Sequence, residues 1–418
     1  MAYALNDFSN ALHNVLLPFI KDNFPKSTIL LDQLKRDANT TVMNNSFYAP
    51  VRTTRHGGVS NLGNDNDTTI SGTAGVGQGS VGVKIITGAF DITKLAIDAT
   101  KSSRSAVESA LTYQATSLAS DFARSINRQF YGDGSGIIGE VIGSVGVGTF
   151  TMGPRTASLD DGRSIDNYGL VNSDLRPEKY ITPGNIIGVG TAAAVIGTVT
   201  GVTTGATAGS ATITMGAGAL AANDAIFLLS GGAIGAGSSE FTGIRNALSS
   251  TTGTSTYAGL ARNTVGWTPQ FGSVSEALSL SRMELSYLRA REYGQSGDRY
   301  AIFMNTTLYK KYGDLLQSMR RVVEPSLLGG WTGLEFAAGA GRVGVFLDYD
   351  VPDGEVIVLN LDSWLICQVG DLDWLEDPNQ GAMLRLSNKI SYQATMVWFA
   401  NLLCLTPAAN GRETQKTG

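Results

Sequence analysis

The residue pattern with the most obvious chemical meaning is the glycine-rich hexapeptide Gly134-Ser135-Gly136-Ile137-Ile138-Gly139. Its G-x-G-x-x-G spacing is that of dinucleotide-binding loops, in which backbone amides at a helix N-terminus face a pyrophosphate. Here the hexapeptide follows the end of a long helical pattern, where the helix dipole is negative. The context therefore predicts a helix cap and a turn rather than a nucleotide site.

The two histidines, His13 and His56, offer little for catalysis or metal binding. His13 lies beside an apolar helical stripe, and His56 follows Arg55 in a polar segment. No H-x-x-x-H or C-x-x-C spacing occurs, so a transition-metal site is not expected. Serine-histidine-acid catalysis would need one of these histidines, and neither has a nucleophile elbow nearby. The sequence thus predicts neither an enzyme nor a bound cofactor.

Paired acids are the remaining candidates for acid–base chemistry. Asp160-Asp161 and Asp371-Asp373 lie beside turn signals, where solvated carboxylates are the common case. The tripeptide Asp65-Asn66-Asp67 begins like a calcium loop but lacks the glycine and the distal glutamate of that motif. We therefore assign no catalytic, cofactor-binding or metal-ligating residue.

The charged residues with the most specific expectation are Arg52 and Arg55, which flank a polar, glycine-rich segment containing Asp65 and Asp67. These arginines are expected to pair with those two carboxylates or with carboxylates of a second copy of the chain; solubility is the alternative role. Further cations on a predicted helix either face DNA or form a solvated face: Lys101, Arg104, Arg124 and Arg128.

Composition limits the classes of function. The 418-residue chain has 43% hydrophobic and only 16% charged residues, with a formal net charge of -5. It lacks the global positive charge of a nucleic-acid-binding protein.

Cys367 and Cys404 lie in apolar runs, which favours buried, reduced thiols over a disulfide and fits cytosolic folding. The uncharged tract between Lys179 and Asp224 is broken by Pro183 and many glycines, so it predicts short strands and no membrane contact.

The elements that must position these residues are dominated by one long amphipathic helix. Its predicted span is from about Ser103 to Tyr131, with Ser102 or Ser103 as N-cap and Gly132 as breaker. Such a helix would be roughly 40 Å long at ~1.5 Å per residue, which suits a plate-like subunit that tiles with copies of itself. Its apolar positions recur every three or four residues: Val107, Leu111, Ala115, Leu118, Phe122, Ile126 and Phe130.

Two features precede this helix. The first is a helical arm whose apolar stripe includes Phe8, Leu12 and Leu16 and is expected to be buried on another subunit. The second is a two-stranded finger, with Ser46 to Arg52 as one strand and Val81 to Ile86 as its return. An isolated hairpin is marginal in water, so the finger is expected to lie on a neighbouring subunit.

The segments after the helix alternate in character. Short β-branched runs from Glu140 to about Val265 predict a small β-barrel or sandwich inserted into the parent domain. An α/β pattern follows, with a helix from Ser275 to Gly294 and a second helix capped by Asn305 or Thr306. Two strands are expected on either side of Pro352-Asp353-Gly354, and the long runs between Met383 and Pro407 predict strands at the edge of a large sheet.

Taken in order, these parts resemble the tailed-phage major capsid protein family, which has the Hong Kong 97-like fold. INRQFYGDGSG resembles the junction that closes the spine helix of such proteins, and SYQATMVWFANLLCLTPAANGR resembles their terminal strand and tail. The resemblance implies an α+β chain divided as follows: N-terminal arm 1–45, extended loop 46–90, peripheral domain with the spine helix 91–139, inserted β-rich domain 140–265, axial α/β domain 266–371, and return strands with a tail 372–418.

The function that the resemblance implies is a subunit of hexamers and pentamers in a virion head that encloses double-stranded DNA and is assembled in the host cytoplasm. It also implies scaffolding, portal and decoration proteins as partners, and DNA contact without sequence specificity. The first lysine after Arg52 is Lys84, so crosslinking through a lysine in the finger, as in some members, is not expected. Two alternatives stay open: the shell of an encapsulin-like compartment, and an enzyme of unassigned class.

Overall fold

The computed structural model describes most of the chain. The described residues are 29–37, 41–59, 61, 71–94, 104–134, 136–146, 149–153, 181, 186–189, 195–204, 211–215, 225–229, 240–249, 256–264, 266–317, 334–338, 341–352, 354–376, 383–386 and 389–417.

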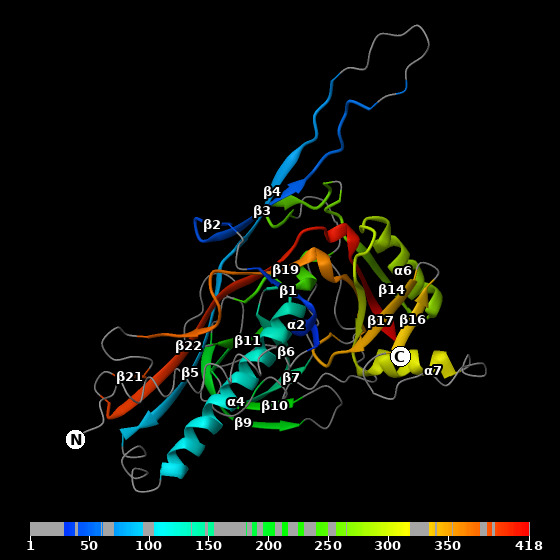
Figure 1. Ribbon diagram of the computed structural model, residues 1–418. Helices are drawn as coiled ribbons and strands as arrows, with labels where there is room; N and C mark the ends of the chain where they lie inside the picture. Colours follow the sequence, from blue (N-terminus) through cyan, green and yellow to red (C-terminus); the bar gives the residue numbers. More distant parts are fainter. Residues whose placement is uncertain are drawn as a thin grey trace.

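A six-stranded sheet forms the long plate seen in Figure 1. Its central strand is β22 (Ser391–Cys404), which pairs with β5 (Lys84–Thr93) on one side and with three strands on the other. These strands are β19 (Trp364–Gln368), β20 (Asp373–Trp374) and β21 (Met383–Arg385), and β1 (Lys35–Asp37) adds to β19 in parallel. The prediction that β22 lies at a sheet edge was wrong, because it has partners along both sides.

The long helix α4 (Arg104–Tyr131) packs on one face of this sheet, and its predicted bounds and glycine stop are confirmed. Alternate residues of β22, among them Met396 and Trp398, are buried together with Ala119 and Phe122 of α4. The helix lies so close to β5 that a Cβ added to Gly88 would be 3.1 Å from Leu118 Cδ1. The short helix α2 (Ile29–Gln33) contributes Leu30 and Leu31 to the same core.

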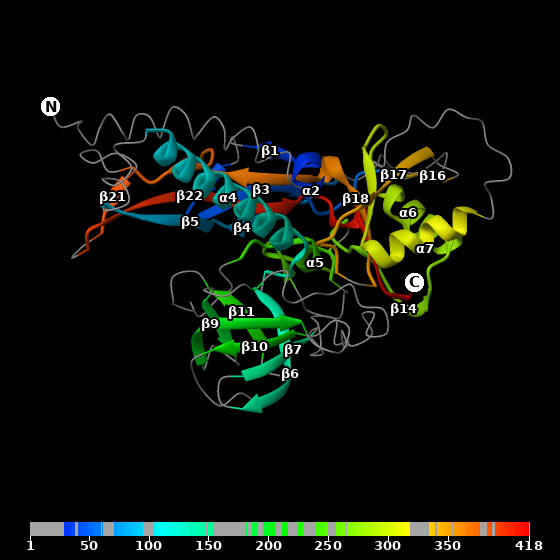
Figure 2. The ribbon, with the colours of Figure 1, turned by 90° about the horizontal axis from the view of Figure 1, so that it is seen from below.

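A second six-stranded sheet lies at the end of the plate opposite β21 (Figure 2). Its order is β14 (Gln270–Ala277), β23 (Gly411–Thr417), β18 (Val356–Asn360), β15 (Tyr300–Met304), β17 (Gly341–Leu347) and β16 (Leu334–Ala338). Helices α6 (Leu280–Glu292) and α7 (Thr306–Gln317) share a core with one face of this sheet.

The helix expected from Ser275 begins later than predicted. Ser275 to Ala277 belong to β14, which pairs with the C-terminal strand, and α6 starts after Ser279, whose side chain accepts a hydrogen bond from the Arg282 amide. The predicted Asn305 cap of α7 is confirmed, since its Oδ1 accepts a hydrogen bond from the Leu308 amide.

Two expectations about strand connections also need correction. The run from Gly354 to Val369 is not one strand: β18 ends at Asn360, a 3₁₀ turn (Leu361–Ser363) follows, and β19 continues in the other sheet. The C-terminal residues, expected in a peripheral tail, pass through the 3₁₀ turn Pro407–Ala409 and form β23 between β14 and β18. Backbone hydrogen bonding on both sides therefore fixes the end of the chain inside the second sheet.

Six strands between residues 137 and 229 close into a barrel, which lies on one side of the plate (Figure 2). The closure order is β10-β7-β6-β11-β8-β9, and the interior holds Val141, Phe150 and Ile213 among other apolar side chains. Its strands contain one charged residue, Glu140. They are β6 (Ile137–Gly146), β7 (Thr149–Gly153), β8 (Ile186–Val189), β9 (Val195–Thr204), β10 (Ala211–Met215) and β11 (Ala225–Leu229).

The finger is an antiparallel hairpin that projects from the body (Figure 1). It consists of β3 (Ser46–Arg52) and β4 (Val76–Gly82), with β2 (Thr41–Met43) on the outer side of β3. The return strand thus starts earlier than predicted and ends before Val83, after which β5 enters the plate. A small hairpin of β12 (Thr256–Tyr257) and β13 (Leu260–Ala261) packs beside its base, and the short helix α5 (Ile244–Ala247) precedes it.

Both cysteines are free and buried, which confirms the prediction of reduced thiols. None of the helices in the described part of the chain is long and apolar enough to cross a membrane.

Candidate assembly surfaces

The base of the finger is fixed firmly to the body. Phe47 and Val81 are buried against Cys367 and Leu403 of the plate. The Asn401 side chain donates a hydrogen bond to the Gly82 carbonyl at 2.6 Å and accepts one from the Thr242 amide at 2.9 Å. Burial and hydrogen bonding at this end allow the hairpin to leave the body in a defined direction.

Beyond its base, several side chains in the described part of the finger are largely exposed. Val59 is 86% exposed and Val76 is 73% exposed. Arg52 donates a hydrogen bond from Nε to the Thr54 carbonyl at 3.1 Å, and the Arg55 side chain is exposed. The outer finger therefore offers apolar side chains and cations to another molecule.

Among the described residues, the face of the plate opposite α4 carries a row of exposed apolar side chains, and we call it the open face. Phe399 of β22 lies directly opposite Ile85 of β5, and on its other side the Val369 amide bonds to the Phe399 carbonyl at 3.0 Å. The exposed fractions of these three side chains are 42%, 59% and 53%. Leu375, whose amide bonds to the Thr395 carbonyl at 2.8 Å, continues the same face with 49% exposure.

This open face follows from the strand period of two. Side chains that alternate with Phe399 along β22, such as Trp398 and Ala400, are buried, because they point toward α4. The same holds for Ile86 beside Ile85 on β5. A row of exposed apolar side chains across neighbouring strands is a typical protein-binding surface.

A buried polar cluster joins the end of α4 to the turn after β17. Asn127 donates from Nδ2 to both carboxylate oxygens of Asp348, at 3.2 and 3.1 Å, and to Asp350 at 2.8 Å. Tyr131 donates its hydroxyl to Asp348 at 3.1 Å. Burial, with a contribution from the neighbouring Asp350 charge, raises the pKa of Asp348, and burial beside Asp348 raises the pKa of Tyr131 well above its usual value.

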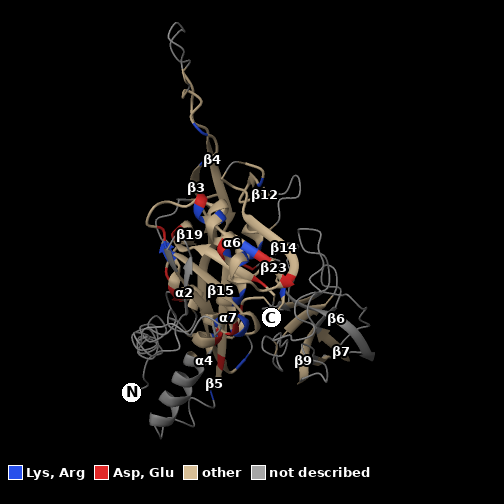
Figure 3. Cartoon of the chain, turned by 90° about the vertical axis from the view of Figure 1, so that its right-hand side faces the viewer, with Lys and Arg blue, Asp and Glu red and all other residues tan. Residues whose placement is uncertain are grey.

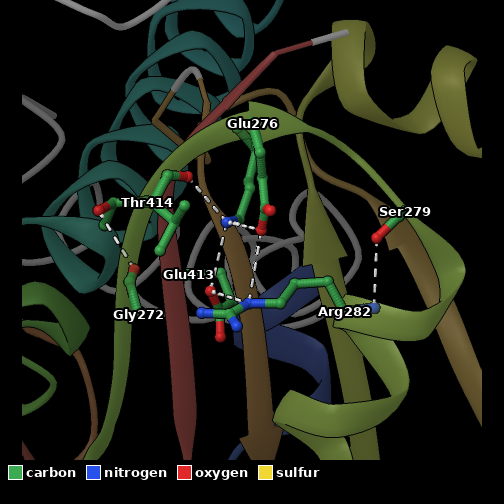
Figure 4. Close-up of polar contacts among 8 residues, drawn as sticks. Gly272, Glu276, Ser279, Arg282, Glu413 and Thr414 are labelled. Carbon is green, nitrogen blue, oxygen red and sulfur yellow. Dashed lines mark hydrogen bonds and ion pairs between the residues drawn. The ribbon is translucent and has the colours of Figure 1, made fainter.

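The C-terminal strand is held by a network of charges, shown in Figure 4. The Lys416 ammonium lies 2.8 Å from a Glu276 carboxylate oxygen and 3.5 Å from Glu413, and it also donates to the Val274 carbonyl at 3.0 Å. Arg282 of α6 adds a contact of 3.2 Å to Glu413. The hydrogen bond and the charge of Lys416 lower the pKa of Glu276. Figure 3 shows charged residues gathered in this region around α6, β14 and β23.

A second ion pair of β23 is almost completely buried. Arg412 makes two contacts with Glu355, from Nη2 at 2.7 Å and from Nε at 3.0 Å, with exposed fractions of 2% and 0%. Arg245 of α5 approaches the same carboxylate at 3.3 Å. These contacts connect β23 to the segment through which the chain returns from the barrel.

Two of the residues predicted as subunit contacts, Arg52 and Arg55, lie in the described part of the chain. Arg52 and Arg55 lie on the finger, where they were expected. Asp65 and Asp67, their expected carboxylate partners, lie outside the described residues, as do Phe8, Leu12 and Leu16 of the arm.

One charged residue of the long helix has a different role from either expectation. Arg128 forms a two-contact ion pair with Glu240, and both side chains are only 12% exposed, so Arg128 neither faces DNA nor belongs to a solvated face. Arg124 is exposed. Lys101 and the side chain of Arg104 lie outside the description.

The open face was not recognised in the sequence. Ile85 and Ile86 are consecutive residues of one predicted strand, so their side chains point to opposite faces of the sheet. The apolar pairs Ile85-Ile86 and Trp398-Phe399 were the available signal that both faces of the plate are apolar.

The glycine hexapeptide and the acidic residues can be compared with the geometry. The glycine hexapeptide leads into strand β6 rather than into a helix, so it lacks the amide cradle of a nucleotide loop. Within the described residues, no three or more His, Cys, Asp or Glu side chains gather as metal ligands.

No family model matches the sequence, and no curated protein is similar to it. Among solved structures, the chain is similar to the capsid asymmetric unit of cyanophage A-1(L), with 12% identity and a TM-score of 0.49 over 92% of this chain and 91% of that chain. It is also similar to the capsid of the native GTA particle, with 12% identity and a TM-score of 0.44 over 93% of this chain and 90% of that chain. The virus-like particle from Pyrococcus furiosus is 10% identical, with a TM-score of 0.40 over 97% of this chain and 98% of that chain.

In each case the similarity spans at least 90% of both chains. The chain is similar along its length, at low sequence identity, to chains of these phage and GTA capsids.

Proposed function

We propose that this protein is the major capsid protein of a tailed phage. Copies of the chain assemble as hexamers and pentamers into a head that encloses double-stranded DNA. The observation that carries the proposal is the combination of two exposed surfaces among the described residues: a finger that is anchored at its base and projects from the body, and an apolar open face on the plate. Each surface needs a partner, and a second copy of the chain supplies both.

The energetics favour repeated association over a free monomer. Full burial of one large apolar side chain contributes about 1.5–3 kcal/mol, and the side chains of the open face are about half exposed in the single chain. One contact of this kind is weak, but a closed shell repeats it in every subunit. Low charge and a net charge of -5 suit this function, because the packaged DNA must later be released.

The remaining parts of the proposal follow from the same arrangement. The second sheet would point to the centre of each capsomer, the plate with α4 would form the wall of the shell, and the barrel would be a site for decoration proteins. Scaffolding and portal proteins are the other expected partners. The virion is the expected location of the mature protein, after assembly in the host cytoplasm.

Electron microscopy of the purified protein, with variants of the open face, tests this function. We expect closed shells or ring-shaped capsomers from the unaltered chain. The double variant I85T/F399S should lose them and keep its unfolding temperature, since exposed positions change stability by about 0.5 kcal/mol or less. Val274→Thr, at a 48% exposed position on β14, is the matched control and should assemble normally.

Two results would count against the proposal. A monodisperse monomer at all salt concentrations, even when co-expressed with neighbouring phage proteins, would exclude a shell subunit. Shells that contain a protein cargo and no nuclease-protected DNA when isolated from their natural cells would indicate an encapsulin-like compartment instead.

A further inference from the structure

Asn410 and Gly411 form a chemically reactive dipeptide between the 3₁₀ turn Pro407–Ala409 and strand β23. They are the one Asn-Gly pair in the sequence. Glycine has no side chain, so its backbone nitrogen can reach the side-chain amide of a preceding asparagine without hindrance. For this reason Asn-Gly is the dipeptide that loses ammonia most readily in an unfolded chain. Position 410 is therefore a candidate site of covalent modification.

The deamidation reaction needs only water. The Gly411 nitrogen bonds to Cγ of Asn410, and the proton of that nitrogen leaves with Nδ2 as ammonia, which closes a five-membered succinimide ring. Water then opens the ring at one of its two carbonyl groups. One opening leaves aspartate at position 410. The other leaves isoaspartate, in which the main chain passes through Cβ and Cγ and is one carbon longer.

The backbone of the folded chain does not permit ring closure. The ring forms only when Cγ, Cβ and Cα of Asn410, its carbonyl carbon and the Gly411 nitrogen lie nearly in one plane. Asn410 has φ −127° and ψ 150°, an extended conformation that turns the Gly411 nitrogen out of this plane. Two backbone hydrogen bonds of 3.0 Å fix the conformation: the Asn410 amide donates to the Pro407 carbonyl, and the Asn410 carbonyl accepts from the Gln270 amide.

The side chain of Asn410 is fixed as well. Its Oδ1 accepts hydrogen bonds from the Asn360 amide at 2.8 Å and from Trp364 Nε1 at 2.9 Å. Its Nδ2, the atom that would leave, donates to the Ser363 hydroxyl at 3.0 Å and to the Thr406 carbonyl at 2.8 Å. The residue is 0% exposed, so solvent does not reach the amide. The site is closed while the second sheet is intact.

Neither product fits this site. Aspartate puts a carboxylate oxygen in place of Nδ2, so two acceptors would face each other at the Thr406 carbonyl, and a buried charge costs free energy unless it is paired. Isoaspartate lengthens the main chain directly before Gly411, which pairs with Val358 of β18 and with Gln270 of β14. The additional carbon would shift the start of β23 out of register with both neighbours.

We propose that Asn410-Gly411 is a deamidation site that folding closes. The amide survives in the folded protein, whereas a chain that stays unfolded loses it and can no longer complete the second sheet. Because the change is covalent, delayed folding becomes irreversible without the action of another protein. This chemistry does not depend on assembly into a shell; within the proposed function, it would keep late-folding copies out of the capsid.

Peptide mass spectrometry of the full-length chain tests the site. The protein is held at mildly alkaline pH in native buffer and in denaturant, and the conversion of each asparagine amide to an acid is followed. In denaturant, Asn410 should convert at least tenfold faster than Asn401, which is equally buried in the folded chain but precedes Leu402. In native buffer, Asn410 should convert at least tenfold more slowly than in denaturant. Equal rates in the two buffers, or equal rates at the two asparagines in denaturant, would overturn the proposal.

A double variant separates deamidation from other losses during refolding. Gly411→Ala hinders the attacking nitrogen, but its Cβ would lie 2.8 Å from Ser286 Oγ, a buried hydroxyl without a hydrogen-bond partner among the described residues. S286A/G411A removes that clash, and Ser286→Ala alone is the matched control. After increasing times in denaturant, the recovery of folded protein on dilution should fall as Asn410 converts in the control, and it should stay high in the double variant. Equal loss of recovery in the two variants would contradict the proposal.

The unaltered chain provides a measurement that needs no variant. After delayed refolding, its folded fraction is separated by size-exclusion chromatography and should contain only chains that keep the amide at Asn410. The misfolded fraction should contain the deamidated chains. Deamidated chains in equal proportion in both fractions would show that the second sheet tolerates the modification, and would overturn the proposal.

Discussion

At the scale of single residues, the buried charges of this chain differ in how completely they are paired. Arg412 has a two-contact, nearly inaccessible pair with Glu355, and its guanidinium also lies 5.6 Å from the centre of the Phe271 ring. Arg245 reaches the same carboxylate at 3.3 Å, while its Nε and Nη2 make no hydrogen bond. Planar, two-contact geometry is the stronger arrangement, so the two arginines should contribute unequally.

Replacing each arginine by methionine measures this difference. Arg412→Met leaves a fully buried carboxylate without its main partner and should lower the free energy of unfolding by about 3–5 kcal/mol. Arg245→Met keeps the Arg412–Glu355 pair, so its loss should be clearly smaller. Denaturant unfolding of both variants in the same assembly state checks the order; equal losses would show that the two arginines share the carboxylate evenly.

The thiol of Cys404 is expected to be inert in the folded protein. It is fully buried, and burial raises its pKa to about 12. At pH 8 it is therefore neither ionised nor accessible, and the thiolate is the reactive form. A thiol-reactive dye should label the native protein far more slowly than the protein in denaturant. Fast labelling of Cys404 in the native state, located by mass spectrometry of the peptides, would contradict the burial.

At the scale of elements, the sequence predicted well where local pattern and tertiary environment agree. The apolar stripe and glycine stop of α4 placed its start one residue early and its end correctly. The failure at Ser275 to Ala277 has a clear cause: these residues have no strong strand preference, but the distant β23 supplies their backbone partners. Pairing between segments so far apart in the chain leaves no local signal.

Of the two candidate surfaces, the finger was predicted from the sequence and the open face was not. The finger was recognised because it has too few apolar residues to cover itself. The open face was missed, since the alternation of β22 shows that two faces exist but not that a helix covers only one. The prediction that β22 is an edge strand was wrong for a related reason: its partners on both sides come from other parts of the sequence.

The segment that returns from the barrel makes a close contact with the end of α4, and a glycine permits it. A Cβ added to Gly243 would lie 2.2 Å from the Gly132 carbonyl oxygen and 2.6 Å from that of Gln129. Backbone atoms at a helix end cannot move aside easily. Gly243→Ala should therefore destabilise the protein by roughly 1–3 kcal/mol, as other overpacked sites do.

Thermal unfolding of Gly243→Ala beside a matched variant checks this contact. A Cβ added to Gly201 of β9 would meet no atom within 4 Å, so Gly201→Ala should leave the unfolding temperature nearly unchanged. A loss of equal size in both variants would mean that the general cost of adding a methyl group, and not the helix contact, determines the result.

At the scale of the whole molecule, the finger is anchored to the plate at its base and projects away from it (Figure 1). The paired part of the finger is closed by the Thr53 amide, which donates to the Gly75 carbonyl at 2.9 Å, and its base is fixed by the core around Phe47. The residues between Thr53 and Gly75 that the structure describes contribute no side chain to the buried core. Their function must therefore be sought between molecules.

Replacing residues 54–74 with Asn-Gly tests this division directly. A two-residue Asn-Gly turn suits the twist of a hairpin, so β3 and β4 should still pair and the monomer should keep its unfolding temperature. The concentration needed for shell assembly should rise at least tenfold, equivalent to about 1.4 kcal/mol per subunit, because the outer finger no longer reaches a neighbour. The charge-reversed variant R52E/R55E, with the finger intact, measures the share carried by the two arginines. Shells of normal yield and heat resistance from the shortened chain would show that the finger is not an assembly element, and the open face alone would then have to account for association.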